Sequence, residues 1–196
     1  MECDWEIEIG AGSPVIDAAW EGYVDLRTAP GRVAEISEAA LTPTLAETLV
    51  RLNSPASLFW TSKCDVWPVK EFDPDEMDAE RENAISAEAC YIDLIPANAG
   101  ISSTLDGVAD WCRRLCLHLR TRPLRQCRVD AIVRRAFATA GIEGIGITVY
   151  ATACGSSPQE RLAVLSSALS ALADSVLALA SADHQQSKYN QDIVGE

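Results

Sequence analysis

Hydrophobic and polar residues alternate along several segments of the chain, and a period of two predicts β-strands. In residues 5–9, Trp5, Ile7 and Ile9 share one face and two glutamates share the other. Later segments combine this alternation with branched and aromatic residues, which favour strands. We expect strands at residues 5–9, 18–26, 57–67, 88–95, 126–137 and 145–154.

Apolar residues at helical spacing predict helices between these strands. Three start signals are typical of capped helices: Thr42 before Pro43, Ser103 with Asp106, and Ser157 before Pro158. We expect helices at residues 33–40, 42–52, 104–121 and 158–182. Residues 71–85 form an acidic connection, and residues 183–196 form a polar tail beyond a single domain of residues 1–182.

Two segments of the chain contain the pattern Tyr-x-Asp-Leu. Tyr23, Asp25 and Leu26 match Tyr91, Asp93 and Leu94 at an offset of 68 residues. A proline after each following helix keeps this offset, and a Cys-x-Val pair in each following strand repeats at an offset of 63. We interpret residues 19–70 and 86–137 as two copies of one β-α-β unit. The alternative is that strand-like sequence recurs by chance.

Two β-α-β units in tandem predict an α+β fold with a ferredoxin-like split βαβ core. An extra N-terminal strand and a C-terminal β-α extension complete the expected fold. Right-handed crossovers would place the helices mainly on one face of an antiparallel sheet. In this topology the strands at 18–26 and 88–95 are adjacent and central, so Asp25 and Asp93 would be neighbours.

Alternation then divides the strand residues between an apolar face and a polar face. The apolar face would include Cys64, Val66, Cys90, Ile92 and Val129, and Trp60 would also point into the core. Thr61 would lie on the polar face. The main candidate binding residues there are Tyr23, Asp25, Lys63, Asp65, Trp67, Tyr91, Asp93, Arg128, Asp130, Arg134 and Tyr150. Whether the final helix covers this face is open at this stage.

The formal net charge of −13 disfavours a nucleic-acid binder, because a phosphate backbone requires a basic surface. The charges are segregated: residues 71–88 hold eight acids and one arginine, a sum of −7, and residues 113–135 hold eight arginines and one aspartate, a sum of +7. The two segments could neutralise each other. Alternatively, the arginines could form a site for an anionic ligand or partner.

The seven cysteines include no CxxC pair, so we expect reduced core thiols and predict no metal or other cofactor. Cys112 and Cys116 lie on an apolar helix stripe, whereas Cys154 precedes a capped helix, where a thiol can become reactive. The N-terminus does not resemble a secretion signal. The apolar run 162–180 contains Asp174 and favours a buried helix, so we expect a cytoplasmic protein without a membrane span.

No catalytic motif is present in the sequence, so the function most consistent with it is protein interaction. The protein would bind a protein partner, or self-associate as a homodimer, through the polar sheet face. The alternative is a small enzyme or a domain that binds an anionic ligand or a metal. That alternative would use Asp25 and Asp93 together with Lys63 and Arg128 on the same face.

Overall fold

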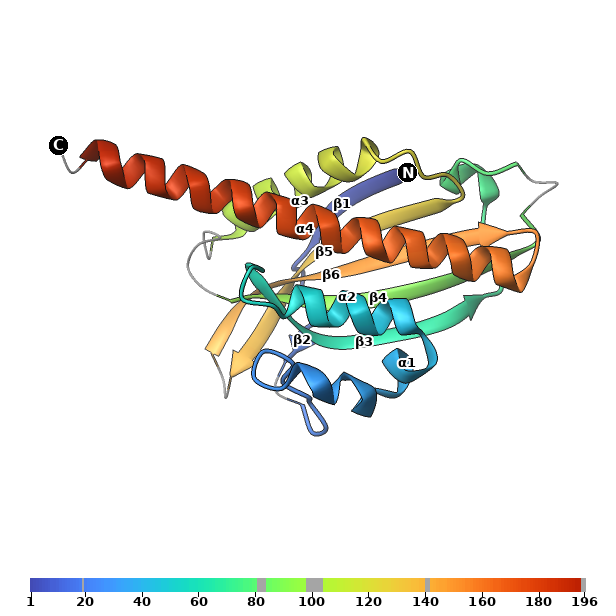
Figure 1. The fold of residues 1–196 in the computed structure, drawn as a ribbon, viewed down its shortest axis with the longest axis horizontal. Coiled ribbons are helices and arrows are strands. Elements are labelled where there is room, and N and C mark those ends of the chain that lie inside the picture. The colour runs from blue at the N-terminus through green and yellow to red at the C-terminus, as the bar shows by residue number, and fades with distance from the viewer. Residues whose placement is uncertain (19, 81–83, 98–103, 140–141, 195–196) are drawn as a thin grey trace.

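The computed structural model describes residues 1–18, 20–80, 84–97, 104–139 and 142–194. It confirms an α+β fold (Figure 1). The strands are β1 (Glu2–Glu8), β2 (Ile16–Asp17), β3 (Phe59–Val69), β4 (Ser86–Pro96), β5 (Cys127–Thr139) and β6 (Ile142–Gly155). The helices are α1 (Ser37–Leu41), α2 (Pro43–Leu52), α3 (Leu105–Arg120) and α4 (Pro158–Val194), with 3-10 turns at Pro30–Glu35 and Pro74–Met77.

The strands form one mixed sheet in the order β1-β5-β6-β4-β3. β1 and then β2 lie parallel to successive parts of β5, and the other neighbours are antiparallel. The prediction of a purely antiparallel sheet is therefore wrong. A ferredoxin-like core is not confirmed, because none of residues 18 and 20–26, which the structure describes within the expected strand 18–26, belongs to a strand of the sheet.

A turn replaces that strand. The Tyr23 amide donates to the Trp20 carbonyl over 3.2 Å, and Gly22 between them has a φ of 95°. A glycine is suited to this position because positive φ strains residues that carry a Cβ. Asp25 then accepts from the Arg27 amide, an Asx turn that bends the chain again. The two Tyr-x-Asp-Leu segments thus have different structures, and the predicted β-α-β repeat lacks its first strand.

Helices α2, α3 and α4 cover one face of the sheet, with α4 between the other two (Figure 1). This position explains why α4 is apolar on several sides, since it contacts the sheet and both neighbouring helices. Leu165, Leu169, Leu172 and Val176 are buried in this layer. The helix continues to Val194, so the prediction that it ends near residue 182 is wrong.

Within the described residues, Pro158–Gln185 of α4 is one segment long and apolar enough to cross a membrane by length and composition. Of its most apolar window, 44% is buried inside the fold. Core helices pass the same test, and the packing of α4 against the sheet accounts for its composition.

The predicted apolar face is confirmed where the strands are regular: Cys90, Ile92, Val129 and their neighbours pack against the helices. In β3 a β-bulge between Thr61 and Cys64 shifts the register against β4. Alternation does not hold across a bulge, because the extra residue reverses the two faces. The prediction for Thr61 is wrong for this reason, since Thr61 lies on the helix side, where it binds Asn53. Trp60 is buried as expected, but in a second apolar cluster with Ile16 and Ile95 on the opposite face of the sheet.

The helix start signals have mixed outcomes. Ser157 accepts from the Glu160 amide, and the Glu160 carboxylate accepts from the Ser156 amide, which forms a reciprocal cap on α4. Thr42 makes no side-chain hydrogen bond, although Pro43 does begin α2. The predicted capping residue Ser103 lies outside the described residues, and Thr104 caps α3 by accepting from Gly107.

Candidate functional site: the open sheet face

The sheet face opposite α2, α3 and α4 carries the polar strand residues, and we call it the open sheet face. The pairing of the strands determines which side chains lie next to each other on this face. One line of directly opposed residues crosses β1, β5, β6, β4 and β3, and we call it the central row: Asp4, Asp130, Tyr150, Tyr91 and Asp65. The two tyrosines occupy the middle of the row and carboxylates occupy both ends.

Three half-buried aromatic residues form what we call the aromatic cluster: Trp67, Tyr91 and Tyr150. Their ring centroids are 5.9 to 6.4 Å apart, with tilted or edge-on geometry. This spacing is typical of favourable aromatic contacts. Burial, followed by the charges of Asp93 and Asp65, raises the pKa of Tyr91 to about 12, so its hydroxyl stays protonated at neutral pH.

A hydrogen-bond network lies beside the cluster. Arg134 binds Glu8 over 2.8 Å and also donates to the hydroxyls of Thr148 and Tyr150. The Thr148 hydroxyl donates in turn to the Asp93 carboxylate over 2.7 Å. Asp93 is only 6% exposed, and burial raises its pKa even though Thr148, Arg134 and Lys63 act in the opposite direction. Through Arg134, the network connects the Tyr150 hydroxyl to Glu8, Thr148 and Asp93.

Two predicted site residues, Tyr23 and Asp25, do not lie on a strand of this face as expected. Asp25 is in the turn after Gly22, and its carboxylate binds the Arg27 guanidinium over 2.8 Å. That guanidinium lowers the pKa of Asp25. The ring of Tyr23 packs against Trp60, 5.6 Å between centroids. The predicted pairing of Asp25 with Asp93 is wrong, because Asp25 lies in no strand of the sheet.

The other nine predicted residues lie on the strands of the face: Lys63, Asp65, Trp67, Tyr91, Asp93, Arg128, Asp130, Arg134 and Tyr150. Two hollows lie beside the aromatic cluster. The β3 hollow, about 330 Å³, lies between β3 and the segment 20–38, and Tyr91 lines it. The β1 hollow, about 450 Å³, lies over β1, β5 and β6, and Tyr150 lines it.

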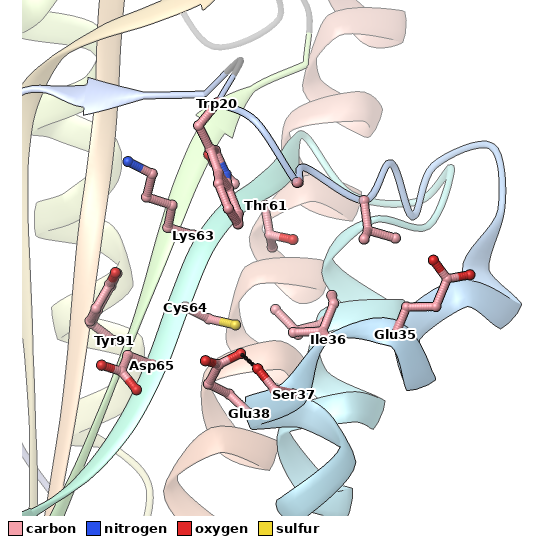
Figure 2. A pocket seen from close by; sticks show the side chains of 14 residues that line it. Trp20, Glu35, Ile36, Ser37, Glu38, Thr61, Lys63, Cys64, Asp65 and Tyr91 are labelled. Atoms are coloured by element: carbon pink, nitrogen blue, oxygen red, sulfur yellow. Dashed lines mark hydrogen bonds between the residues drawn. The ribbon is translucent and has the colours of Figure 1, made fainter.

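Figure 2 shows the side chains that line the β3 hollow. Glu38 and Asp65 lie at one end, on either side of Cys64. Lys63 points the other way, toward Trp20, where its ammonium lies 5.8 Å from the ring centroid. The β1 hollow has a similar composition: three acids, Asp4, Glu6 and Asp130, with one base, Arg128.

The arginines of residues 113–135 mostly bind acids elsewhere in the fold. Arg128 binds Asp130 over 2.8 Å, and Arg125 binds Asp78 of the acidic connection over 3.1 Å. Arg113, Arg114 and Arg135 have carboxylate partners too. Most of these arginines are thus paired with carboxylates, which disfavours an arginine-rich anion site. Arg125 and Arg128 bind acids of residues 71–88, and the other three bind acids elsewhere in the chain.

All seven cysteines are free thiols, and six are buried. Burial raises the pKa of Cys64 to about 12, and it also raises the pKa of Cys154, where the Glu160 charge acts in the same direction. A reactive thiol requires a lowered pKa, so Cys154 lacks the environment of a nucleophile. The sulfur atoms of Cys3 and Cys116 lie 2.9 Å apart in the core. Among the described residues, no group of three or more potential ligands could hold a metal ion.

Comparison of the chain with protein-family models, with curated proteins and with solved structures gives no match. We therefore infer the role of the site from its geometry alone. Sequence reasoning missed four residues that matter there: Asp4, Glu6, Trp20 and Glu38. Alternation in residues 2–8 could have indicated Asp4 and Glu6, but not the strand beside them. No local signal places Trp20 or Glu38 next to β3, because only the fold brings them there.

Proposed function

We propose that the protein is a cytoplasmic, non-enzymatic interaction module that binds a protein partner through the open sheet face. The observation that carries this proposal is the aromatic cluster of Trp67, Tyr91 and Tyr150, half-buried in the middle of the sheet face opposite α2, α3 and α4. Two apolar clusters cover the ends of this face, one around Trp60 and one around Met77, and leave the aromatic cluster between them. The core does not require these rings. Aromatic residues at the centre of a patch, within a polar rim, are typical of protein interfaces.

The rim supports a partner different from the protein itself. Acids surround the cluster at Asp4, Glu6, Asp65 and Asp130. Two copies meeting face to face would bring these carboxylates together, at an electrostatic cost. A basic partner would instead gain from them and associate faster. The free cysteines support a reducing compartment, which is consistent with the cytoplasm.

The alternative function, a small enzyme or ligand-binding domain, needed Asp25 beside Asp93 with free basic groups. Asp25 is bound to Arg27, and Arg128 is bound to Asp130. Asp93 does have a raised pKa, which is typical of functional carboxylates. However, it is enclosed by Thr148 and lines neither hollow. The geometry favours the interaction module.

Affinity capture from the native host tests this proposal, with Trp67→Thr as the test variant. Threonine keeps strand propensity, so we expect the fold to survive and partner recovery to fall at least about ten-fold, as for a central interface aromatic. Leu117→Gln is the matched control, because Leu117 is 56% exposed on α3, on the opposite side of the molecule. The measurement is quantitative mass spectrometry, with circular dichroism to confirm folding.

The proposal fails if Trp67→Thr and the parent recover the same proteins in the same amounts. It also fails if the parent recovers nothing above empty beads and light scattering shows a monomer. A parent dimer that Trp67→Thr dissociates would identify a second copy as the partner and overturn the argument from acidic repulsion.

A further inference from the structure

We propose that the partner presents two basic side chains, arginine or lysine, which enter the β3 hollow and the β1 hollow on either side of the aromatic cluster. This inference rests on the proposed function and specifies the partner's chemistry. It comes from the central row, where Asp65 and Asp130 flank the two tyrosines and Asp4 lies beyond. Each end of the row lies in one of the two hollows.

Each hollow has a pair of carboxylates available for a cation. In the β3 hollow these are Glu38 and Asp65, and in the β1 hollow they are Asp4 and Glu6. None of the four has an ion-pair partner among the residues that the structure describes. Their hydrogen bonds are local: Glu38 accepts from Ser37, Asp65 from the Val66 amide and Asp4 from the Trp5 amide.

The bases present in the hollows do not neutralise these pairs. Lys63 is directed toward the ring of Trp20 and away from Glu38 (Figure 2). Arg128 is bound to Asp130 through its Nε and Nη2 atoms. An incoming guanidinium or ammonium would therefore meet carboxylates that form no ion pair with these bases, although the charge of Asp4 already acts on Arg128.

The titrating groups in the β3 hollow record the same negative field. After burial, the charges of Glu38 and Asp65 are the next causes that raise the pKa of Cys64 to about 12. The charges of Asp93 and Asp65 follow burial in raising the pKa of Tyr91. Both groups are thus disfavoured as anions by carboxylates that would attract a cation.

The walls of the β3 hollow also suit an organic cation. Tyr91 lines it, and an aromatic face attracts guanidinium and ammonium groups. The Trp20 ring shows the same preference, because the Lys63 ammonium already lies 5.8 Å from its centroid. Ser62 lines the hollow as well, and its buried hydroxyl has no hydrogen-bond partner in the described part of the chain. A guanidinium, with five N–H donors in a fork geometry, can bind a carboxylate of the hollow at two points, which an ammonium cannot do. This combination favours arginine there.

The sheet geometry fixes the spacing of the two cations. Neighbouring strands are about 4.8 Å apart, so Asp65 lies about 14 Å from Asp130 and about 19 Å from Asp4 along the central row. The partner must therefore place its two charges about 14 to 19 Å apart, with an apolar surface between them for the aromatic cluster. Two basic residues separated by four residues of extended chain meet this condition.

The test uses an acetylated Arg-Pro-Pro-Pro-Pro-Arg amide as the probe, since a polyproline spacer spans about 3.1 Å per residue and holds the arginines about 15 Å apart. Titration into ¹⁵N-labelled protein is followed by NMR. We expect shift changes at the amides of residues 63–65 and 128–130. The citrulline counterpart, which lacks the charge, and an Arg-Arg-Pro-Pro-Pro-Pro peptide should each bind at least about five-fold more weakly.

Paired variants locate the effect. Glu38→Gln with Asp65→Asn should weaken probe binding about five-fold, and Asp4→Asn with Glu6→Gln should do the same. Glu47→Gln with Asp106→Asn is the matched control, because both residues are exposed acids on the helix layer and the change in net charge is identical. The spectra themselves report whether each variant is folded.

The inference is overturned if the probe does not bind at millimolar concentration, or if the citrulline peptide binds equally well. It is also overturned if the control pair weakens binding as much as the hollow pairs, since general acidity would then suffice. These outcomes leave the proposed function intact as long as Trp67→Thr, which keeps all four carboxylates, still abolishes partner capture.

Discussion

At the residue scale, Asp93 is a buried carboxylate on the open sheet face, only 6% exposed. Its pKa is raised because burial outweighs the hydrogen bond from Thr148 and the charges of Arg134 and Lys63. A carboxyl with a raised pKa in the folded state makes its full contribution to stability below its unfolded pKa, near 3.9. That contribution is lost as the pH rises through the folded pKa. Ionised Asp93 thus lowers stability at neutral pH relative to the same carboxyl in its protonated form.

Asp93→Asn should therefore be more stable than the parent at pH 7, because the amide still accepts from Thr148 without a buried charge. The advantage should shrink as the pH falls and vanish near pH 4. The measurement is the urea midpoint of unfolding across that pH range. A variant that is less stable than the parent, by a gap that widens with pH, would show that Arg134 and Lys63 stabilise the carboxylate more than burial destabilises it.

At the scale of elements, segments with a regular hydrophobic period were predicted correctly, and segments with an irregular backbone were not. The strands at β3, β4, β5 and β6 and the helices α2 and α3 follow from alternation, helical spacing and start signals. The turn at Gly22 and the bulge after Thr61 break that periodicity, and each moved candidate residues to the wrong place. A glycine inside a presumed strand was the available warning sign. The parallel pairing of β1 with β5 depends on long-range contacts and has no local signal.

Gly22→Ala tests the importance of that turn. A Cβ at this position would meet the Trp20 ring at 3.0 Å, and the φ of 95° would be strained as well. We expect a loss of about 1–3 kcal/mol in the free energy of unfolding. Gly31→Ala is the control, since a Cβ there meets nothing within 4 Å, and it should be nearly neutral. Equal unfolding midpoints in urea for the two variants would contradict the assigned turn.

Ser157→Ala tests the cap of α4, the helix that joins the other two helices to the sheet. Loss of the bond to the Glu160 amide should cost about 1 kcal/mol. Ser167→Ala is the matched control, because the exposed Ser167 hydroxyl binds only the carbonyl one turn earlier. It should change little or stabilise slightly by helix propensity. Thermal unfolding of both variants distinguishes the cap from a general effect of removing a hydroxyl.

At the scale of the molecule, the two faces of the sheet have different roles. The face under the helices forms the main core, and the open sheet face carries the candidate binding residues. Three helices bury one side of the sheet, and the polar residues that the core does not need gather on the other. Most of the candidate face was predictable, because a period of two sorts residues correctly wherever a strand is regular. The two hollows were not predictable, since Trp20 and Glu38 reach β3 only through the folded path of residues 20–38. The open sheet face is acidic, like the chain as a whole with its net charge of −13, and this negative charge would attract a basic partner.

Hydroxyl-radical footprinting of the captured complex against the free protein tests the central claim most directly. Oxidation of Trp67, Tyr91 and Tyr150 should fall several-fold in the complex, because a bound partner excludes solvent from the centre of the interface. Oxidation of Leu117 and Leu162, exposed on the helix layer, should not change. Protection of Leu117 and Leu162, with the three aromatic residues oxidised as in the free protein, would place the partner on the helices and contradict the account.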